Sequence, residues 1–388
     1  MLELSKSIED EIISIRRQIH SFAELGFDLE KTCGLIEEEL RGLGIEPERV
    51  GRSGLSFTLG SQGPVILLRA DMDALTMEEE TDLDFRARNG NSHSCGHDAH
   101  AAMLLGAAKI LKPMEDQLPG RVKFMFQPAE EILAGAKDMV DNGILENPKV
   151  QAALALHIDV GREEARSGQV YYGLGNVNFS GDAIRLIVKG RAAHGSTPHL
   201  GIDAIDVAVK LIGALNTLVK NTSSPSQPVV LLVGKIQAGT AVNTVADRAE
   251  LEISLRTKSQ EVRERLLAEI ERISLGLGQV YGAEVIFQHS YGMPNMYNDP
   301  DLSRELLSYA GELLGQSSLV ETAGFTGSED FSYISQRVPS FMFSLGVGSL
   351  DEGYRHSLHH ASMVLNEEAL HIGASLYAYL AYRFLENK

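Results

Sequence analysis

Cysteine is scarce in this chain of 388 residues, which contains only Cys33 and Cys95. Two cysteines do not make the disulfide framework that stabilises small secreted domains. The first residues are polar and acidic and lack the apolar core of a signal peptide. We therefore expect a cytoplasmic protein, with Cys33 as a buried apolar thiol in a helix.

Basic clusters and long apolar runs are also missing. The chain has 35 Lys and Arg against 53 Asp and Glu, which gives a formal net charge of -18. No apolar segment reaches the roughly 18–20 residues that a membrane-spanning helix needs. These features argue against nucleic acid and membranes as partners and leave a small molecule as the expected ligand.

Several short catalytic motifs are absent as well. The sequence has no G-x-S-x-G nucleophile elbow, no H-E-x-x-H zinc helix and no G-x-x-x-x-G-K-[ST] phosphate loop. Gly173-Leu174-Gly175 lacks both the third glycine and the following helix of a dinucleotide site. The chemistry of this chain therefore has to come from other residues.

Apolar periodicity predicts an α/β protein, and a chain of this length is too long for one simple core. Helices are expected at 5–22, 99–111 and 369–385, and strands at 65–68, 122–126, 152–156 and 340–345. Residues 179–293 follow instead the order βαββαβ of a two-layer sandwich. We expect a mixed, mostly parallel sheet in a domain of residues 1–178 and 294–388, with residues 179–293 inserted as a smaller domain.

Acidic and imidazole side chains follow three successive predicted strands of the larger domain. They are, in chain order, Asp71 and Asp73, Glu130 and Glu131, and His157. Taken singly, the aspartates could close an Asx turn and the glutamates could lie in a solvated loop. Because parallel strands end at the same edge of a sheet, their coincidence favours a single site.

One cysteine lies in the densest titratable segment of the chain, Ser92-His93-Ser94-Cys95-Gly96-His97-Asp98-Ala99-His100. Thiolates, imidazoles and carboxylates are ligands for metals of the Zn, Mn or Co kind. Three more histidines, at positions 356, 359 and 360, follow the predicted strand 340–345, and the residues alone do not choose among them. One of these would join Cys95, His97, Glu131 and His157 as five ligands. Five ligands suit two metal ions that share a bridging group and a water.

The neighbouring Glu130 and Glu131 suggest a division of labour, because adjacent side chains at a strand end point in different directions. One can bind a metal while the other takes a proton from the metal-bound water and returns it to a leaving amine.

The smaller domain offers groups for a substrate. His194 lies in a loop rich in Gly, Ser, Thr and Pro, where an imidazole could stabilise an oxyanion. Asn243 and Arg256 flank the predicted strand 249–255 and could hold a carboxylate. A plain turn around His194 and a surface ion pair of Arg256 are the alternatives.

Five stretches of the chain resemble the aminoacylase-type metallopeptidases, peptidase family M20, in the amidohydrolase branch of hippurate hydrolases, N-acyl-amino-acid deacylases and auxin-conjugate hydrolases. They are Arg69-Ala70-Asp71-Met72-Asp73-Ala74-Leu75, Ser94-Cys95-Gly96-His97-Asp98-Ala99-His100, Phe126-Gln127-Pro128-Ala129-Glu130-Glu131, His194-Gly195-Ser196-Thr197-Pro198-His199-Leu200-Gly201-Ile202-Asp203 and Gly327-Ser328-Glu329-Asp330-Phe331.

The resemblance implies a dinuclear centre and an inserted lid domain that often dimerises. Its ligands would be Cys95, His97, Glu131, His157 and His359, with Glu130 as the general base and Asp73 as support. His359 is favoured because Val364-Leu365-Asn366-Glu367-Glu368 follows it as in the family. Two departures are His360-Ala361 after the last ligand and Gly195-Ser196-Thr197 after the lid histidine.

We therefore predict a metal-dependent amidohydrolase, a homodimer joined through the lid, that cleaves N-acyl amino acids to a carboxylic acid and a free amino acid. Glu130 would deprotonate a water bridging two ions of Zn, Mn, Co or Ni, while His194, from the same chain or a partner's lid, stabilises the oxyanion. A dipeptidase or carboxypeptidase on the same centre is the near alternative, and a non-catalytic binding protein is the distant one.

Overall fold

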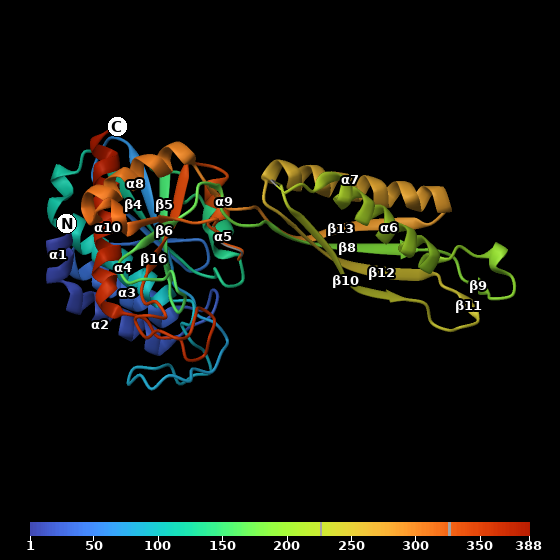
Figure 1. Cartoon of the computed structure of the whole chain (residues 1–388), viewed down its shortest axis with the longest axis horizontal. Helices are drawn as coiled ribbons and strands as arrows, with labels where there is room; N and C mark the ends of the chain where they lie inside the picture. Colours follow the sequence, from blue (N-terminus) through green and yellow to red (C-terminus); the bar gives the residue numbers. More distant parts are fainter. Residues whose placement is uncertain (226, 325–326) are drawn as a thin grey trace. The chain divides into compact units, whose positions relative to one another are not determined.

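The computed structural model describes residues 1–225, 227–324 and 327–388 (Figure 1). The chain divides into two compact units. The large unit consists of Met1–Gly175, Tyr297–Gly324 and Glu329–Lys388, and the small unit consists of Asn176–Met296 with Gly327 and Ser328. Within the described residues, no helix is both long enough and apolar enough to cross a membrane.

A mixed, mostly parallel sheet forms the centre of the large unit, as the sequence predicts. Its order is β1-β2-β4-β3-β5-β16-β6-β15. The strands are β1 (Glu48–Val50), β2 (Gly54–Leu59), β3 (Val65–Asp71), β4 (Arg121–Gln127), β5 (Ala152–Asp159), β6 (Val170–Tyr172), β15 (Leu319–Glu321) and β16 (Ser340–Gly346). The four central strands β4, β3, β5 and β16 run parallel, so their carboxyl ends share one edge.

Helices cover this sheet. They are α1 (Leu2–Ser7), α2 (Glu9–Phe22), α3 (Glu30–Gly42), α4 (His97–Leu111), α5 (Gly135–Asp141), α8 (Pro300–Leu314), α9 (Ser332–Ser335) and α10 (Leu370–Glu386). Helix α4 is buried along nearly its whole length, because it packs on β3 and against α2 and α10. Its first residue, His97, is therefore held at the carboxyl edge of the sheet by a fixed element.

The single helix expected over residues 5–22 is wrong. The structure has two helices, α1 and α2, because Ile8 leaves the helical conformation with φ -114° and ψ 15°. The hydroxyls of Ser5 and Ser7 donate to the carbonyls of Leu2 and Leu4. Such local bonds from serine compete with the helical ladder, so the apolar spacing alone overstates the helix.

The small unit is an antiparallel sheet with two helices on one face (Figure 1). Its elements are β8 (Gly181–Lys189), β9 (Ala193–His194), α6 (Ala204–Thr222), β10 (Val229–Ala238), β11 (Thr244–Val245), β12 (Arg248–Thr257), α7 (Gln260–Tyr281) and β13 (Glu284–Met293). The sheet order is β10-β12-β8-β13, and alternate residues of β12 point into the core under α6 and α7.

Candidate metal centre

The three strand ends singled out in the sequence meet at one edge of the large sheet. Asp71, the last residue of β3, pairs in register with Gln127 at the end of β4. His157 lies on β5, which runs two residues further than predicted, to Asp159. Gly96 brings α4 to the same place with φ 83°, and an added Cβ there would lie 2.2 Å from Ile158 Cδ1. Only glycine therefore permits this approach of α4 to β5.

Among the described residues, five groups of three potential metal ligands form here, and two of these groups share Cys95. Cys95, His97 and His157 make the first, and Cys95, Glu131 and His359 make the second, with one ligand atom of each residue within 4.8 Å of the others. The Cys95 Sγ lies 3.5 Å from His157 Nε2, and His359 Nε2 lies 3.8 Å from Glu131 Oε2. A thiolate at Cys95 would therefore be within reach of the ligands of both groups.

These residues fit divalent cations. Within the described part of the chain, the Nε2 of buried His97 and the Oε1 of Glu131 have no hydrogen-bond partner. Buried polar atoms in folded proteins are nearly always paired, so orphaned ligand atoms that converge point to an ion. His157 donates from Nδ1 to the carbonyl of Ile158 at 2.6 Å, which leaves Nε2 free to coordinate.

The Cys95 side chain is also consistent with a metal. Burial raises the pKa of the Cys95 thiol above its usual range, which favours the neutral form in the metal-free protein. A bound divalent cation reverses this preference, because coordination deprotonates a thiol.

Asp73 fixes the turn that carries the two glutamates. Its carboxylate accepts hydrogen bonds from the backbone N–H of Glu130 at 2.9 Å and of Glu131 at 3.2 Å. The same carboxylate lies 3.5 Å from Nδ1 of His97. The turn begins at Ala129, whose φ of 55° is in the left-handed region. Asp73 thus connects the glutamate pair to the imidazole.

Glu130 is buried beside this cluster, with Oε2 at 3.9 Å from Nε2 of His97. Burial, followed by the nearby carboxylates of Glu329 and Asp330, raises the pKa of Glu130 well above its usual range. A carboxylate with a raised pKa is a better proton acceptor, which is what a general base requires.

Arg69 is the main residue that the sequence analysis left without a role. Its side chain is fully buried, and its guanidinium donates to Asp71 at 2.7 Å, Glu329 at 2.9 Å and Asp330 at 3.1 Å. A fourth bond reaches Gln127 Oε1 at 2.8 Å. The sequence did offer one sign of this role, because Arg69 is a cation within the apolar run of β3. An arginine is almost never fully buried unless it is paired, so its position indicates paired side chains in the core.

His100 belongs to a further group of potential ligands, with Asp71 and His97, but both of its ring nitrogens already make hydrogen bonds. Its Nδ1 donates to Asp71 at 2.5 Å, and its Nε2 accepts from the backbone N–H of Ile158 at 2.9 Å. Burial lowers the pKa of His100 to about 4, so the ring is neutral with both nitrogens in use. Asp98 is likewise engaged, by Arg16 Nε at 2.6 Å and His20 Nδ1 at 2.8 Å.

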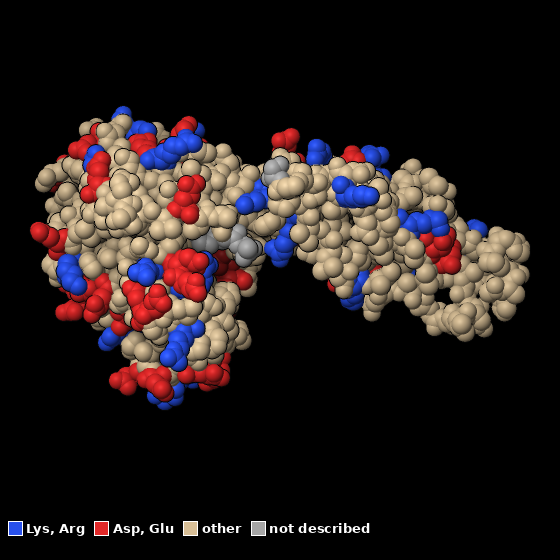
Figure 2. Space-filling model, viewed as in Figure 1, with Lys and Arg blue, Asp and Glu red and all other residues tan. Residues whose placement is uncertain are grey.

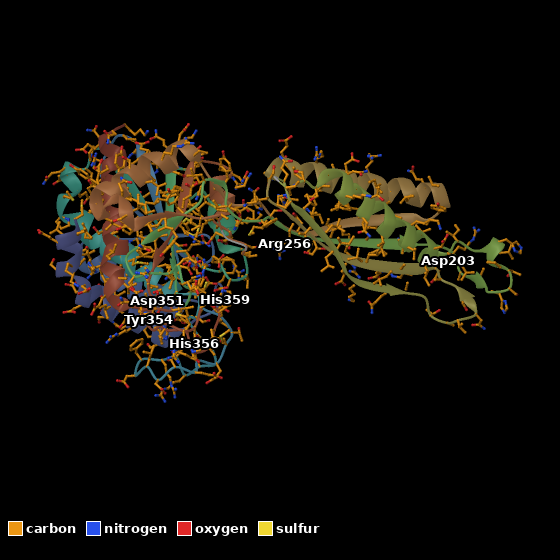
Figure 3. All side chains as sticks on the ribbon, in the orientation of Figure 1. Asp203, Arg256, Asp351, Tyr354, His356 and His359 are labelled. Atoms are coloured by element: carbon orange, nitrogen blue, oxygen red, sulfur yellow. The ribbon has the colours of Figure 1, made fainter. Side chains whose placement is uncertain are left out.

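The histidines that follow β16 differ in their surroundings. Among the described residues, His359 belongs to a group of potential ligands, whereas His356 and His360 do not. Those two rings stack on each other with centroids 4.1 Å apart. His359, which Figure 3 labels on the large unit together with His356, has a backbone φ of 62°. Its N–H donates to the carbonyl of Ser94, the residue before Cys95, at 2.8 Å.

The remaining predicted residues lie in the small unit. His194 pairs with Thr244 between β9 and β11, and the next residue, Gly195, donates to the Asn243 carbonyl at 2.7 Å. Arg256 lies near the other end of β12, where Nη1 donates to Ser328 Oγ at 3.0 Å. About 27 Å of β12 lies between Arg256 and the end of the small unit that carries His194 and Asn243. The small unit therefore brings His194 and Asn243 together but not with Arg256.

The sequence profile of peptidase family M20/M25/M40 matches residues 67–383. The chain belongs to this family. Thermostable carboxypeptidase 1 of Saccharolobus solfataricus is 35% identical over 98% of this chain and 96% of its own length. N-acetylcysteine deacetylase of Bacillus subtilis is 32% identical over 98% of this chain and 99% of its own length.

Solved structures agree with these relatives. The Bacillus subtilis YXEP protein, a dinuclear metal binding peptidase, has a TM-score of 0.79 and 30% identity over 99% of this chain and 100% of its own. A protein from methicillin resistant Staphylococcus aureus has a TM-score of 0.90 and 32% identity over 98% of both chains. The chain is thus a metal-dependent hydrolase that acts on amide bonds and binds divalent metal ions.

Proposed function

We propose that this hydrolase cleaves N-acyl amino acids to a carboxylic acid and a free amino acid. The observation that carries the proposal is Glu130, a buried carboxyl with a raised pKa placed 3.9 Å from a ring nitrogen of His97. A binding protein has no need of a proton acceptor next to a ligand cluster. Hydrolysis of an amide does need one, first for water and then for the leaving amine.

Cys95, His97, Glu131, His157 and His359 would hold two divalent cations, whose chemistry is to polarise the scissile carbonyl and to make water acidic. Glu130 accepts the proton of the attacking water and later donates it to the leaving nitrogen. Asp73 keeps Glu130 and Glu131 in place through their backbone N–H groups. The mixed thiolate, imidazole and carboxylate set suits Zn, Mn, Co or Ni.

The inserted residues 179–293, which lie within the small unit, are proposed to act as a lid that binds the rest of the substrate. Arg256 would hold the free carboxylate, because a guanidinium matches its two oxygens. His194 would stabilise the oxyanion, and Asn243 would contribute to holding the substrate carboxylate. Since about 27 Å of strand separates them from Arg256, one copy of the small unit cannot present all three to a small substrate. We infer that His194 and Asn243 act in the site of a second copy.

Exposed apolar groups on the small unit support a homodimer through the lid. On β10, at the edge of its sheet, Val230 and Leu232 are 54% and 59% exposed. At the end that carries β9 and β11, Leu200 and Val242 are strongly exposed, and few charged residues appear there in Figure 2. Such surfaces are typical of protein interfaces. The two unbridged cysteines support a cytoplasmic location.

The second candidate is a dipeptidase or carboxypeptidase, favoured by the 35% identity to Thermostable carboxypeptidase 1. Both activities use the same centre and differ in the acyl side of the substrate.

The test is a mass-spectrometric screen of the metal-loaded protein against N-acetyl and N-benzoyl amino acids and dipeptides. We expect N-acyl amino acids to be cleaved fastest, with turnover lowered by about 10²–10⁴-fold in Glu130→Gln. Faster cleavage of dipeptides would select the second candidate. Metal binding with no hydrolysis in the screen would refute both.

A further inference from the structure

The loop between β4 and α5 carries both Glu130 and Glu131, and its two ends lie close together. Strand β4 ends at Gln127, and helix α5 begins at Gly135. A Cβ on Gly135 would overlap the carbonyl oxygen of Pro128, so glycine is required for this approach. The proposed base and one proposed metal ligand therefore depend on how a single closed loop is held.

The backbone of this loop is strained at two positions. Ala129 and Leu133 both lie in the left-handed region, with φ of 55° and 54°. Residues other than glycine keep this conformation only where surrounding contacts hold it. Asp73 supplies such contacts at the middle of the loop, where its carboxylate accepts from the backbone N–H groups of Glu130 and Glu131. The two ends of the loop are held by a different group.

The carboxyl group of Asp330 is bonded to both ends of the loop. Its Oδ1 accepts from Gln127 Nε2 at 2.7 Å, and its Oδ2 accepts from the backbone N–H of Ala136 at 2.9 Å. Oδ1 also accepts from Arg69 Nη2 at 3.1 Å. Asp330 is fully buried, as is the next residue, Phe331. The loop is thus fastened to a segment of the large unit that lies far from it in the sequence.

We propose that Asp330 is a positioning residue that closes the loop between β4 and α5 and so keeps Glu130 in place to accept the proton of the attacking water. The proposal rests on the proposed function, because it takes Glu130 as the base. A carboxyl group suits this role because both of its oxygens accept hydrogen bonds, whereas an amide has one oxygen and an NH₂ group that only donates. Asparagine has the same shape but can hold only one end of the loop.

Loss of one end should loosen the loop without unfolding the large unit. Burial raises the pKa of Asp330 to about 8, so the neutral amide of Asp330→Asn removes no charge that the fold needs near pH 7. One unmade bond should make local opening of the loop about 10-fold more frequent. A displacement of about 1 Å at Glu130 lowers the rate on the order of 10²-fold. Because Glu130 acts on water, KM should change little.

The first measurement needs no turnover. Hydrogen exchange of peptides that cover residues 128–136 is followed by mass spectrometry in the full-length, chelator-treated protein. We expect these amides to exchange about 10-fold faster in Asp330→Asn, with unchanged exchange in β3 and α4. Asp138→Asn is the matched control on α5, because Asp138 accepts from the Arg52 N–H at 2.8 Å through one oxygen, a bond that asparagine can keep.

The second measurement separates kcat from KM on the best substrate of the screen, after all proteins are brought to the same metal content. Asp330→Asn should lower kcat about 10²-fold and change KM by less than about 2-fold, whereas Asp138→Asn should keep both. Gln127→Met removes the bond at the β4 end and leaves the carboxyl group in place. It should lower kcat in the same way and replaces Asp330→Asn if that variant does not fold.

Unchanged exchange of the loop in Asp330→Asn overturns the proposal, and so does faster exchange of the loop with an unchanged kcat. Equally faster exchange throughout β3, β4 and β5 also overturns it, because the residue would then stabilise the unit as a whole. If the wild type cleaves no amide in the screen, the proposed function fails alone, and the exchange measurement still decides whether Asp330 closes the loop.

Discussion

Replacing Arg69 by methionine is the sharpest test of how the buried charges of the large unit are balanced. The guanidinium lies between the carboxyls of Asp71, Glu329 and Asp330 and is wholly shielded from water. Burial raises the pKa of Asp330 to about 8, so that group already carries a proton near neutral pH. Burial alone would raise the pKa of the Asp71 carboxyl. The nearby charge of Arg69 opposes this effect and holds the pKa of Asp71 well below its usual range. Asp71 is thus the charge that depends most on Arg69.

The magnitude follows from the proton that Asp71 must take up when the guanidinium is gone. An aspartate has an ordinary pKa of about 3.9, and each pH unit above it adds about 1.36 kcal/mol to the cost of keeping the group neutral. Arg69→Met should therefore lower the free energy of unfolding by about 4 kcal/mol at pH 7 and by about 1.5 kcal/mol at pH 5. Breaking a buried ion pair typically costs a similar amount, about 3–5 kcal/mol.

The direction in which the stability loss of Arg69→Met changes with pH distinguishes a lost charge from lost packing. In the wild type, the depressed pKa of Asp71 contributes stability above pH 3.9 that is lost as the pH falls through the folded-state pKa. The difference between wild type and variant therefore shrinks towards acid. A loss caused by packing alone would be equal at both pH values.

The assay is urea denaturation of chelator-treated protein, followed by far-ultraviolet circular dichroism because the chain has no tryptophan. Hydrogen exchange of peptides from β3, β4 and β5 assigns the transition to the large unit. Arg121→Met is the control, since Arg121 opens β4 and makes an exposed bond to the Gly63 carbonyl. It should cost less than about 1 kcal/mol. Equal losses in the two variants, or equal losses of Arg69→Met at pH 7 and pH 5, would refute the reasoning.

Three further changes test the site and its surroundings. Cys95→Ala should lower the metal content measured by inductively coupled plasma mass spectrometry, while Cys33→Ala retains it; full loading of both would remove the thiolate from the centre. Burial alone would lower the pKa of His20, but hydrogen bonds to the carboxylates of Asp98 and Glu79 raise it above its ordinary value. The contribution of protonated His20 to stability is complete below about pH 6.5 and is lost as the pH rises through the folded-state pKa. The denaturation curves of the wild type and His20→Gln should therefore converge at alkaline pH. A difference in stability that stays the same at every pH contradicts this. Mixing the separately inactive Glu130→Gln and His194→Ala proteins should restore activity if the lid of one copy serves the site of another, and a mixture that stays inactive argues for a lid that acts within one chain.

Sequence patterns were most informative where a side chain ends a buried strand. Apolar runs located β3, β4 and β5, and the parallel direction of these strands placed Asp71, His157 and the glutamate pair at one edge. This prediction needed no knowledge of the loops, because the sheet itself fixes where its strands end.

The sequence did not predict contacts between side chains from distant segments of the chain. Glu329 and Asp330 accept hydrogen bonds from Arg69, which lies 260 and 261 residues earlier in the chain, and no local pattern shows which acid meets which cation. The choice among the three histidines after β16 depends on backbone conformation, in particular the left-handed φ of His359. Apolar periodicity also missed the break at Ile8, because the hydroxyls of nearby serines decide it.

The discontinuous large unit has a consequence for synthesis on the ribosome. The small unit is nearly one continuous segment, whereas β5 pairs with β16, as Ala153 does with Ser340, and α4 packs against the C-terminal α10. At about 5–20 residues per second, the apolar edge of β5 waits on the order of 10–40 s for its neighbour to be translated. An open, apolar strand edge invites pairing with other chains. We therefore expect nascent or truncated chains that end before β16 to hold a folded small unit and an aggregation-prone remainder that depends on chaperones.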